Sequence, residues 1–199
     1  MDSWKLNGHT LEYIDEVHTY LVDGVIVPSV TQILKWKFNN KYDFVSPAVL
    51  KRAAERGTAT HKAIEDYCKT GIEDDSMELK NFKFLQKHYK FEVLENEIPV
   101  IIFLHDEPLC AGRLDMVLKI GDEIGGADIK RTTILDKEYL AYQLNMYRIG
   151  YKQSYGQEWK FLKGIHLRDD TRRFVNIPIN EDLIIQFLEE YNVSVNADV

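Results

Sequence analysis

Two short runs of alternating polar and apolar residues constrain the fold of this chain most strongly. Ala111 to Ile120 and Glu123 to Lys130 both alternate with the two-residue period of a β-strand. The residues between them, Gly121 and Asp122, are typical of a tight turn. The sequence therefore predicts a β-hairpin, and the alternation assigns each polar side chain of the hairpin to one of two faces.

The polar residues of this hairpin predict a cation site. Arg113 and Asp115 share one face of the first strand, and Asp128 and Lys130 share one face of the second. The apolar residues of the first strand are expected on the opposite face: Leu114, Met116 and Leu118. Two carboxylates beside an amine indicate a divalent cation, because a buried pair of acids without a counter-charge would raise one pKa sharply. Mg²⁺ suits such oxygen ligands, and a surface hairpin with solvated charges is the alternative.

The composition indicates a globular protein of one domain that stays in the cytoplasm. The chain has 199 residues, of which 45% are hydrophobic and 29% are charged. Its net charge of −7 argues against a protein that coats nucleic acid with a broad basic surface, but not against an acidic metal site. No stretch approaches the roughly twenty apolar residues of a membrane span, and the first residues lack the pattern of a signal peptide.

The remaining patterns predict the order of the elements. Gly57 is expected to separate two helices, and serines or a Ser-Pro pair mark the helix starts. The expected order is a β-meander (Thr10–Ile14, His18–Val22, Val25–Val27), helices over Val30–Trp36, Ser46–Arg56, Thr58–Lys69 and Ser76–Tyr89, a strand over Phe91–Leu104, the hairpin, a helix over Asp136–Ser154, strands over Glu158–Leu167 and Arg172–Ile179, and a helix over Asn180–Asn192. This order predicts an α/β (α+β) fold, with a central mixed β-sheet flanked by helices after an N-terminal β-meander.

Two of the expected helices add polar pairs to the hairpin. His61 and Glu65 lie four residues apart and share a helix face, where a neutral imidazole can be a metal ligand or a packed core residue. Gln143 and Tyr147 likewise share a face one turn apart, which ordinarily indicates packing.

Together, these motifs resemble the RecB-like branch of the PD-(D/E)XK nuclease superfamily. The resemblance covers most of the chain and rests on four motifs in the order that the branch has: Gly57 to His61, Gly112 to Asp115, Asp128 to Lys130, and Gln143 to Tyr147. Pro28 to Leu34 is also similar to the first helix of the mitochondrial genome maintenance exonucleases and related phage exonucleases. The resemblance implies a restriction-endonuclease-like core, here a single nuclease domain over 1–199 with the meander and first helix in 1–45 and the core in 46–199.

One departure from the family concerns cysteine. Cys68 and Cys110 are too few for the four-thiolate iron–sulfur cluster of the CRISPR-adaptation and helicase-associated branches, and both are expected to be reduced core residues. No helicase or other additional domain is evident in the sequence. A stand-alone enzyme without an iron–sulfur cluster is therefore favoured.

The resemblance also implies roles for individual residues. Mg²⁺ or Mn²⁺ would be held by His61, Asp115, Asp128 and the backbone carbonyl of Ile129. Lys130 would position or deprotonate the attacking water, or its ammonium would stabilise the charge that builds on the phosphorus centre.

Other residues are expected around this centre. Glu65, and Glu97 in the strand before the hairpin, would assist a second metal or orient water. Gln143 and Tyr147 are similar to family residues that line the nucleic-acid path. The candidates for phosphate contacts are Arg113, Arg131 and Lys137, for which ordinary solvation is the alternative.

The function implied is a metal-dependent deoxyribonuclease, most simply an exonuclease in DNA replication, recombination or repair in a bacterium or a phage-infected cell. Linear single- or double-stranded DNA would be its substrate, and a single-strand annealing or recombination protein and further copies of the chain are expected partners. The end preference comes from the relatives alone. The alternatives are a non-catalytic module that binds nucleic acid or a recombination partner, an endonuclease or RNA nuclease, and a structural metal-binding protein.

Overall fold

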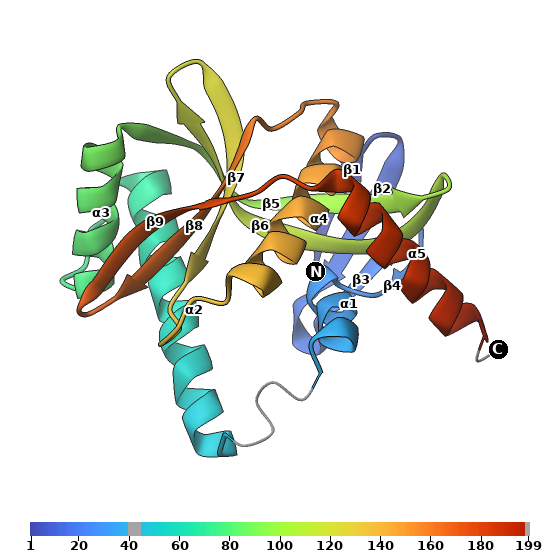
Figure 1. The fold of residues 1–199 in the computed structure, drawn as a ribbon, viewed down its shortest axis with the longest axis horizontal. Coiled ribbons are helices and arrows are strands. Elements are labelled where there is room, and N and C mark those ends of the chain that lie inside the picture. The colour runs from blue at the N-terminus through green and yellow to red at the C-terminus, as the bar shows by residue number, and fades with distance from the viewer. Residues whose placement is uncertain (40–44, 198–199) are drawn as a thin grey trace.

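Two β-sheets organise the computed structural model, which describes residues 1–39 and 45–197 (Figure 1). The first is a four-stranded sheet in the order β1-β2-β3-β4, and the second is a five-stranded sheet in the order β5-β6-β7-β8-β9. Helices flank the larger sheet. The expected α+β architecture, with a mixed central sheet behind an N-terminal meander, is confirmed.

The N-terminal sheet is an antiparallel meander with one strand more than expected. Its strands are β1 (Asp2–Leu6), β2 (His9–Ile14), β3 (Thr19–Val22) and β4 (Val25–Val27), with a 3₁₀ turn over Asp15–Val17. Strand β1 is not among the expected strands, since only Leu6 in it is buried and its apolar alternation is weak. Buried residues of the meander, such as Leu11 and Val22, pack against Ile101 and Ala111 of the larger sheet.

The larger sheet contains the predicted hairpin. Its strands are β5 (Phe91–Leu104), β6 (Glu107–Ile120), β7 (Glu123–Lys130), β8 (Phe161–Arg168) and β9 (Thr171–Ile177). Neighbouring strands are antiparallel except β7 and β8, which run parallel. The pair β6 and β7 closes through Gly121 and Asp122, with Gly121 at a φ of +60°, so the turn is confirmed. Helix α4 (Lys137–Tyr155) makes the connection that the parallel pair requires.

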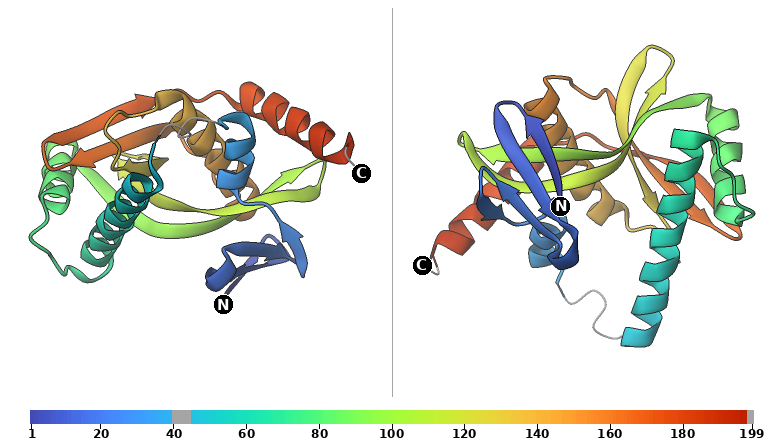
Figure 2. Two further views of the ribbon diagram at one scale, coloured as in Figure 1. Left: turned by 90° about the horizontal axis from the view of Figure 1, so that it is seen from below. Right: turned by 180° about the vertical axis from the view of Figure 1, so that it is seen from behind.

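The helices and the meander cover the two faces of this sheet. One apolar cluster joins α1 (Val30–Lys37), α4 and α5 (Glu181–Ala197) to one face. A second cluster joins α2 (Pro47–Thr70) and α3 (Met77–Tyr89) to the opposite face, and Figure 2 shows the meander and α2 on this same side of the sheet.

Capping side chains set the helix starts, as the sequence predicted. Ser29 forms a capping box with Gln32 at the start of α1, and Ser46 precedes Pro47, the first residue of α2. Ser76 and Asp136 cap α3 and α4 in the same way. At the other end of α2, the left-handed residue Gly71 is the C-cap.

The predicted break at Gly57 is wrong, because α2 runs through it as one helix of 24 residues. A glycine inside a helix costs only about 1 kcal/mol relative to alanine, and the alanine-rich turns around Gly57 offset that cost. Residues 46–56 are exposed, and Figure 1 shows this end of α2 extending past the sheet.

Smaller differences concern the ends of elements. Strand β6 begins at Glu107 and not at Ala111, and α5 extends to Ala197. The expected division after residue 45 adjoins residues 40–44, which lie outside the described residues. In the described parts of the chain, no helix is both long and apolar enough to cross a membrane.

Candidate metal centre

The candidate site forms where the two strands of the hairpin separate. The ladder between β6 and β7 ends at the pair Met116 and Ala127, just before Asp115 and Asp128 would face each other. Beyond that point Ile129 no longer forms ladder hydrogen bonds with the backbone of β6. Its N–H donates to Asp115 Oδ2 over 2.6 Å, so a side chain replaces the missing ladder partner.

The regular alternation predicted for β6 is wrong at this point. Leu114 packs in the apolar cluster with α4, whereas Met116 and Leu118 pack in the cluster with α2 and α3. The irregularity coincides with Glu97 of β5, which lies between the pairs formed by its neighbours and has a left-handed φ of +54°. Such a conformation is uncommon for a residue other than glycine, and it marks a local constraint in the sheet.

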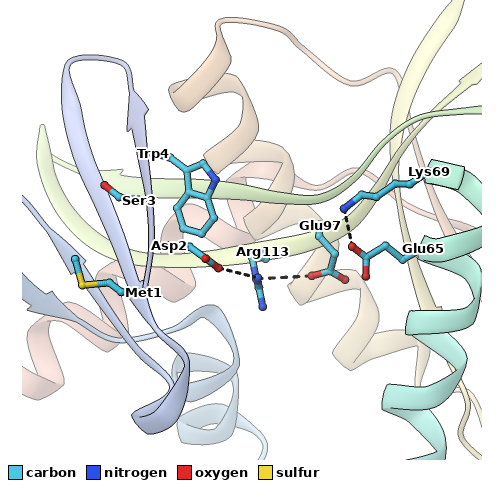
Figure 3. A pocket seen from close by; sticks show the side chains of 8 residues that line it. All are labelled: Met1, Asp2, Ser3, Trp4, Glu65, Lys69, Glu97 and Arg113. Atoms are coloured by element: carbon cyan, nitrogen blue, oxygen red, sulfur yellow. Dashed lines mark hydrogen bonds and ion pairs between the residues drawn. The ribbon is translucent and has the colours of Figure 1, made fainter.

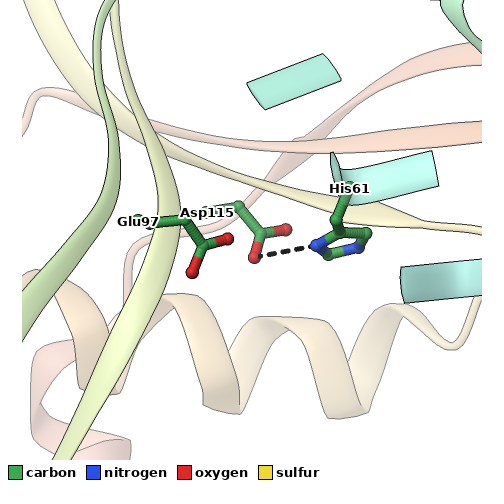
Figure 4. A group of neighbouring side chains, drawn as sticks. All are labelled: His61, Glu97 and Asp115. Carbon is green, nitrogen blue, oxygen red and sulfur yellow. Dashed lines mark ion pairs between the residues drawn. The ribbon is translucent and has the colours of Figure 1, made fainter. Parts of the chain in front are cut away.

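His61 reaches this separation from α2. Its Nδ1 lies 3.4 Å from Asp115 Oδ1 (Figure 4). Its Nε2 lies 3.1 Å from the carbonyl oxygen of Ile129. A carbonyl oxygen only accepts hydrogen bonds, so Nε2 is the donor in the second contact. The carboxylate of Asp115 raises the pKa of His61 to about 9 against the opposing effect of burial, so the ring is a cation at neutral pH.

Asp115 is ionised within this arrangement. Burial alone would raise its pKa, but the nearby charges of His61 and Lys130 and the N–H of Ile129 together lower it. The carboxylate therefore offers oxygen ligands at neutral pH.

Asp128 is the most enclosed acid of the centre, with 2% of its side chain exposed. Burial and the neighbouring Asp115 raise its pKa to about 6. Its Oδ2 lies 2.5 Å from Lys130 Nζ, yet among the described residues this oxygen has no hydrogen bond of normal geometry. The attraction of Asp128 and Asp115 outweighs burial and raises the pKa of Lys130, which keeps the ammonium charged.

The donor set fits a hard divalent cation. Ligand atoms of His61, Glu97 and Asp115 all lie within 4.8 Å of one another, and the Ile129 carbonyl oxygen contacts His61. Asp128 is not one of this group of three, although its charge helps to raise the pKa of His61. The Asp128 carboxylate pairs with the Lys130 ammonium and the His61 cation lies between two oxygen acceptors, so the oxygens of the centre already attract positive charge. Oxygen ligands with one imidazole suit Mg²⁺ or Mn²⁺.

Gln143 and Tyr147 lie beneath the centre and not along an open path. Only 6% of Gln143 and 4% of Tyr147 is exposed, so the expected contact with nucleic acid does not match their burial. Burial, with Asp128 nearby, raises the pKa of Tyr147 well above its usual value. A Cβ at Gly112 would approach the Tyr147 ring to 3.0 Å, which explains why a glycine precedes Asp115 on this strand. Tyr147 therefore packs against the strand that carries Asp115.

A polar cavity of about 590 Å³ opens beside the centre, between the meander and α2 (Figure 3). Arg113 lines it and lies 3.7 Å from both Glu97 and Asp2, with its guanidinium over the Tyr13 ring. Glu65 also lines it and is paired with Lys69 over 2.6 Å. Arg113 and Glu65 thus border the centre as expected, although acidic side chains already pair with the guanidinium. No sequence pattern indicates the contribution of Asp2, because β1 lacks a clear apolar alternation.

Arg131 and Lys137 are not brought to the metal centre. The Arg131 guanidinium lies 2.5 Å from Glu78 and 3.0 Å from Asp169, and 12% of its side chain is exposed. It therefore ties α3 to the β8–β9 turn, and the phosphate contact expected of Arg131 stays a prediction. Lys137 begins α4 and lines a different pocket.

The comparisons with known proteins leave the family open. No protein-family model matches the sequence, and no curated protein matches it. A crystal structure of SSO0001 is similar over 85% of this chain and 76% of its own length, at 16% sequence identity and a TM-score of 0.48. At this level the likeness carries no argument about function.

Proposed function

We propose that this protein is a metal-dependent nuclease that hydrolyses DNA phosphodiester bonds. One observation carries the proposal: His61 contacts both Asp115 and the Ile129 carbonyl, while Lys130 is paired with Asp128 in the same place. The residues come from three elements, α2, β6 and β7. They are the set for which the nuclease motifs assign ligand and catalytic roles.

In this proposal, the residues of the metal centre have separate roles. His61, Asp115, Asp128 and the Ile129 carbonyl would hold Mg²⁺ or Mn²⁺. When bound, the cation would neutralise charge on the scissile phosphate and lower the pKa of a water. Asp128 fixes the Lys130 ammonium next to the ligands, and the raised pKa of Lys130 favours stabilisation of phosphate charge over removal of a proton.

The cavity beside the metal centre and the net charge of the chain indicate how a substrate would bind. The cavity between the meander and α2 gives access to the centre, and its Arg113 and Lys69 are both paired with acids. A protein of net charge −7 with such a cavity would engage its substrate locally, not over a broad surface. We propose linear DNA as the substrate, with exonuclease action in replication, recombination or repair in the cytoplasm, and a recombination or single-strand annealing protein as partner.

A non-catalytic DNA- or partner-binding module on the same fold is the second candidate. The incomplete burial of Lys130, 22% of whose side chain is exposed, instead favours catalysis, because an ammonium used only to neutralise Asp128 has no need to reach the surface. Endonuclease or RNA nuclease action would use the same centre.

A cleavage assay tests the proposal. End-labelled linear DNA and circular DNA, both single- and double-stranded, would be incubated with Mg²⁺, Mn²⁺ or EDTA. Lys130→Ala is expected to lose at least about a hundredfold in rate, whereas Lys160→Ala, an exposed lysine paired with Glu158, is expected to match the wild type. Cleavage of linear substrates alone would identify an exonuclease, and cleavage of circles an endonuclease.

Two outcomes of this assay would contradict the proposal. If wild-type protein leaves every DNA intact with either metal, catalysis on DNA is refuted, and a parallel RNA substrate then decides between an RNA nuclease and the binding module. Equal activity of Lys130→Ala and wild type would remove the assigned role of the ammonium.

A further inference from the structure

A second pocket lies at the start of α4, next to the last two strands of the sheet. Its volume is about 350 Å³, and its polar lining comes from the 131–136 connection, α4, β8 and β9. The polar residues that line it are Thr133, Lys137, His166, Thr171 and Arg173. None of the described residues that line it is acidic, which contrasts with the net charge of −7 of the whole chain.

The strand register places this pocket beside the metal centre. Lys130 of β7 pairs with His166 of β8, which in turn pairs with Arg173 of β9. Residues paired in this way project from the same face of a sheet, and adjacent strands are about 4.8 Å apart. Arg173 therefore lies two strands, or roughly 10 Å, from Lys130. The three residues form a basic row that begins at the centre and ends in the pocket.

His166 has a buried ring nitrogen without a hydrogen-bond partner among the described residues. Only 2% of it is exposed, and its Nε2 lies 2.6 Å from the Thr132 carbonyl oxygen. Its Nδ1 is buried and lacks a hydrogen-bond partner among the described residues, and the same is true of the Thr132 hydroxyl. Unsatisfied buried polar atoms of this kind are few in native proteins, and each needs a partner such as an ordered water or a bound anion. Because Nε2 donates to the Thr132 carbonyl, Nδ1 accepts in the neutral ring and donates only in an imidazolium, whereas the Thr132 hydroxyl can donate to an anionic oxygen in either state.

The two cations of the pocket are available for such an anion. Within the described residues, neither Lys137 nor Arg173 takes part in an ion pair, unlike Arg131 nearby. Two acids close to the pocket are engaged elsewhere: Asp136 caps α4 through the Tyr139 N–H, and Asp169 pairs with Arg131. An anion would therefore meet two cations and a buried donor.

We propose that this anion pocket binds a phosphate group of the nucleic-acid strand, close to the phosphate that is cleaved. The inference rests on the proposed nuclease function and extends it. Lys130 would act at the scissile phosphate, and a second phosphate of the same strand would be bound by His166, Lys137 and Arg173. Because Lys130 and Arg173 lie two strands apart, roughly 10 Å along the sheet, the phosphates that they contact would belong to the same short stretch of one nucleic-acid strand. The phosphate is either a terminal monoester or an internal diester, and the two share the chemistry that the pocket recognises.

Inorganic phosphate is the first probe, because it tests the pocket without metal or cleavage. In EDTA, phosphate added to ¹⁵N-labelled full-length protein is expected to shift the imidazole signals of His166. Paired substitution of Lys137→Gln and Arg173→Gln is expected to weaken this binding about tenfold or more, since two charge-assisted contacts are lost. The matched control is Arg172→Gln, whose guanidinium lies over the Phe84 ring, 3.7 Å from its centroid, on the opposite side of β9.

Short single-stranded oligonucleotides then separate the two sources of phosphate. They would carry a 5′-phosphate, a 3′-phosphate or hydroxyls at both ends, and binding would be followed by anisotropy in EDTA at several salt concentrations. Preference for one phosphorylated end would identify a terminal phosphate, and equal binding an internal diester. In either case, the slope of log K against log salt is expected to fall by about 0.7 for each cation removed.

The proposal is overturned if phosphate leaves the His166 signals unchanged, or if Arg172→Gln weakens binding as much as the paired substitution. Failure of the proposed function looks different: DNA would remain intact with Mg²⁺ or Mn²⁺ while phosphate still shifted His166. Circular dichroism of each variant would show that the substitutions leave the fold unchanged.

Discussion

The histidine at the centre should make the metal-free protein less stable as the pH rises above neutrality. His61 is held as a cation between Asp115 and the Ile129 carbonyl, so its loss of a proton removes an attraction that exists only in the folded state. His61→Gln is the comparison variant, because its amide can still donate to the carbonyl but does not titrate. The difference between the two proteins isolates the contribution of the imidazole.

The size of this effect follows from the pKa of His61, which folding raises from 6.5 to about 9. Each pKa unit corresponds to about 1.4 kcal/mol, so the upper bound is roughly 3 kcal/mol. Because 31% of the side chain is exposed, solvent screening reduces this to about 1–2 kcal/mol. A group whose pKa is raised in the folded state stabilises fully below pH 6.5, and this stabilisation is lost as the pH passes through about 9.

Urea unfolding in EDTA at pH 6, 7.5 and 9.5 would measure the effect. The unfolding free energy of the wild type is expected to fall by about 1–2 kcal/mol more than that of His61→Gln across this range. Parallel pH profiles for the two proteins would refute the placement of a protonated His61 against Asp115. The same proton competes with a metal for the imidazole, so the apparent Mg²⁺ affinity of the wild type should rise with pH up to about 9.

Three further predictions concern single positions. Gly126→Ala should destabilise the fold by about 3 kcal/mol or more in urea unfolding, because the new Cβ would lie 2.1 Å from the Trp159 ring; a loss below 1 kcal/mol would contradict that packing. Gly57→Ala should stabilise by about 0.5–1 kcal/mol, since nothing lies within 4 Å of the added Cβ inside α2, and a destabilised variant would speak against a continuous helix. Mg²⁺ at a hundred times its Kd should stabilise the wild type by about 2.7 kcal/mol in thermal unfolding but leave Asp115→Asn nearly unchanged, and equal shifts would remove Asp115 as a ligand.

The hairpin and the helix starts were predictable because their causes are local. The alternation of β7 and the turn at Gly121 depend on neighbours in sequence, and so do the side-chain caps at Ser29, Ser46 and Asp136. The break expected at Gly57 is wrong for the complementary reason. The cost of one glycine is small compared with the stability of the whole helix, and packing of the second half of α2 against the sheet keeps the helix continuous.

The details of the candidate site depend on contacts between distant segments. The irregularity at Asp115 accompanies a left-handed residue in another strand, Glu97, and no pattern within β6 indicates it. The motif residues Gln143 and Tyr147 were correctly seen as sharing a helix face, but spacing alone does not distinguish a buried face from one that borders a groove. The pairing of Arg131 with Glu78 is equally invisible in sequence, since the two lie 53 residues apart.

The exposed start of α2 implies a gradient of amide hydrogen exchange along a single helix. Residues 46–56 are exposed, whereas Thr60 and Ile64 are buried against the sheet. An isolated helix of fewer than about 12–15 residues is marginal in water, so the first turns retain their hydrogen bonds mainly because the packed half nucleates them. Amides of these turns should exchange through frequent local opening, while those that follow His61 exchange only when the domain unfolds as a whole.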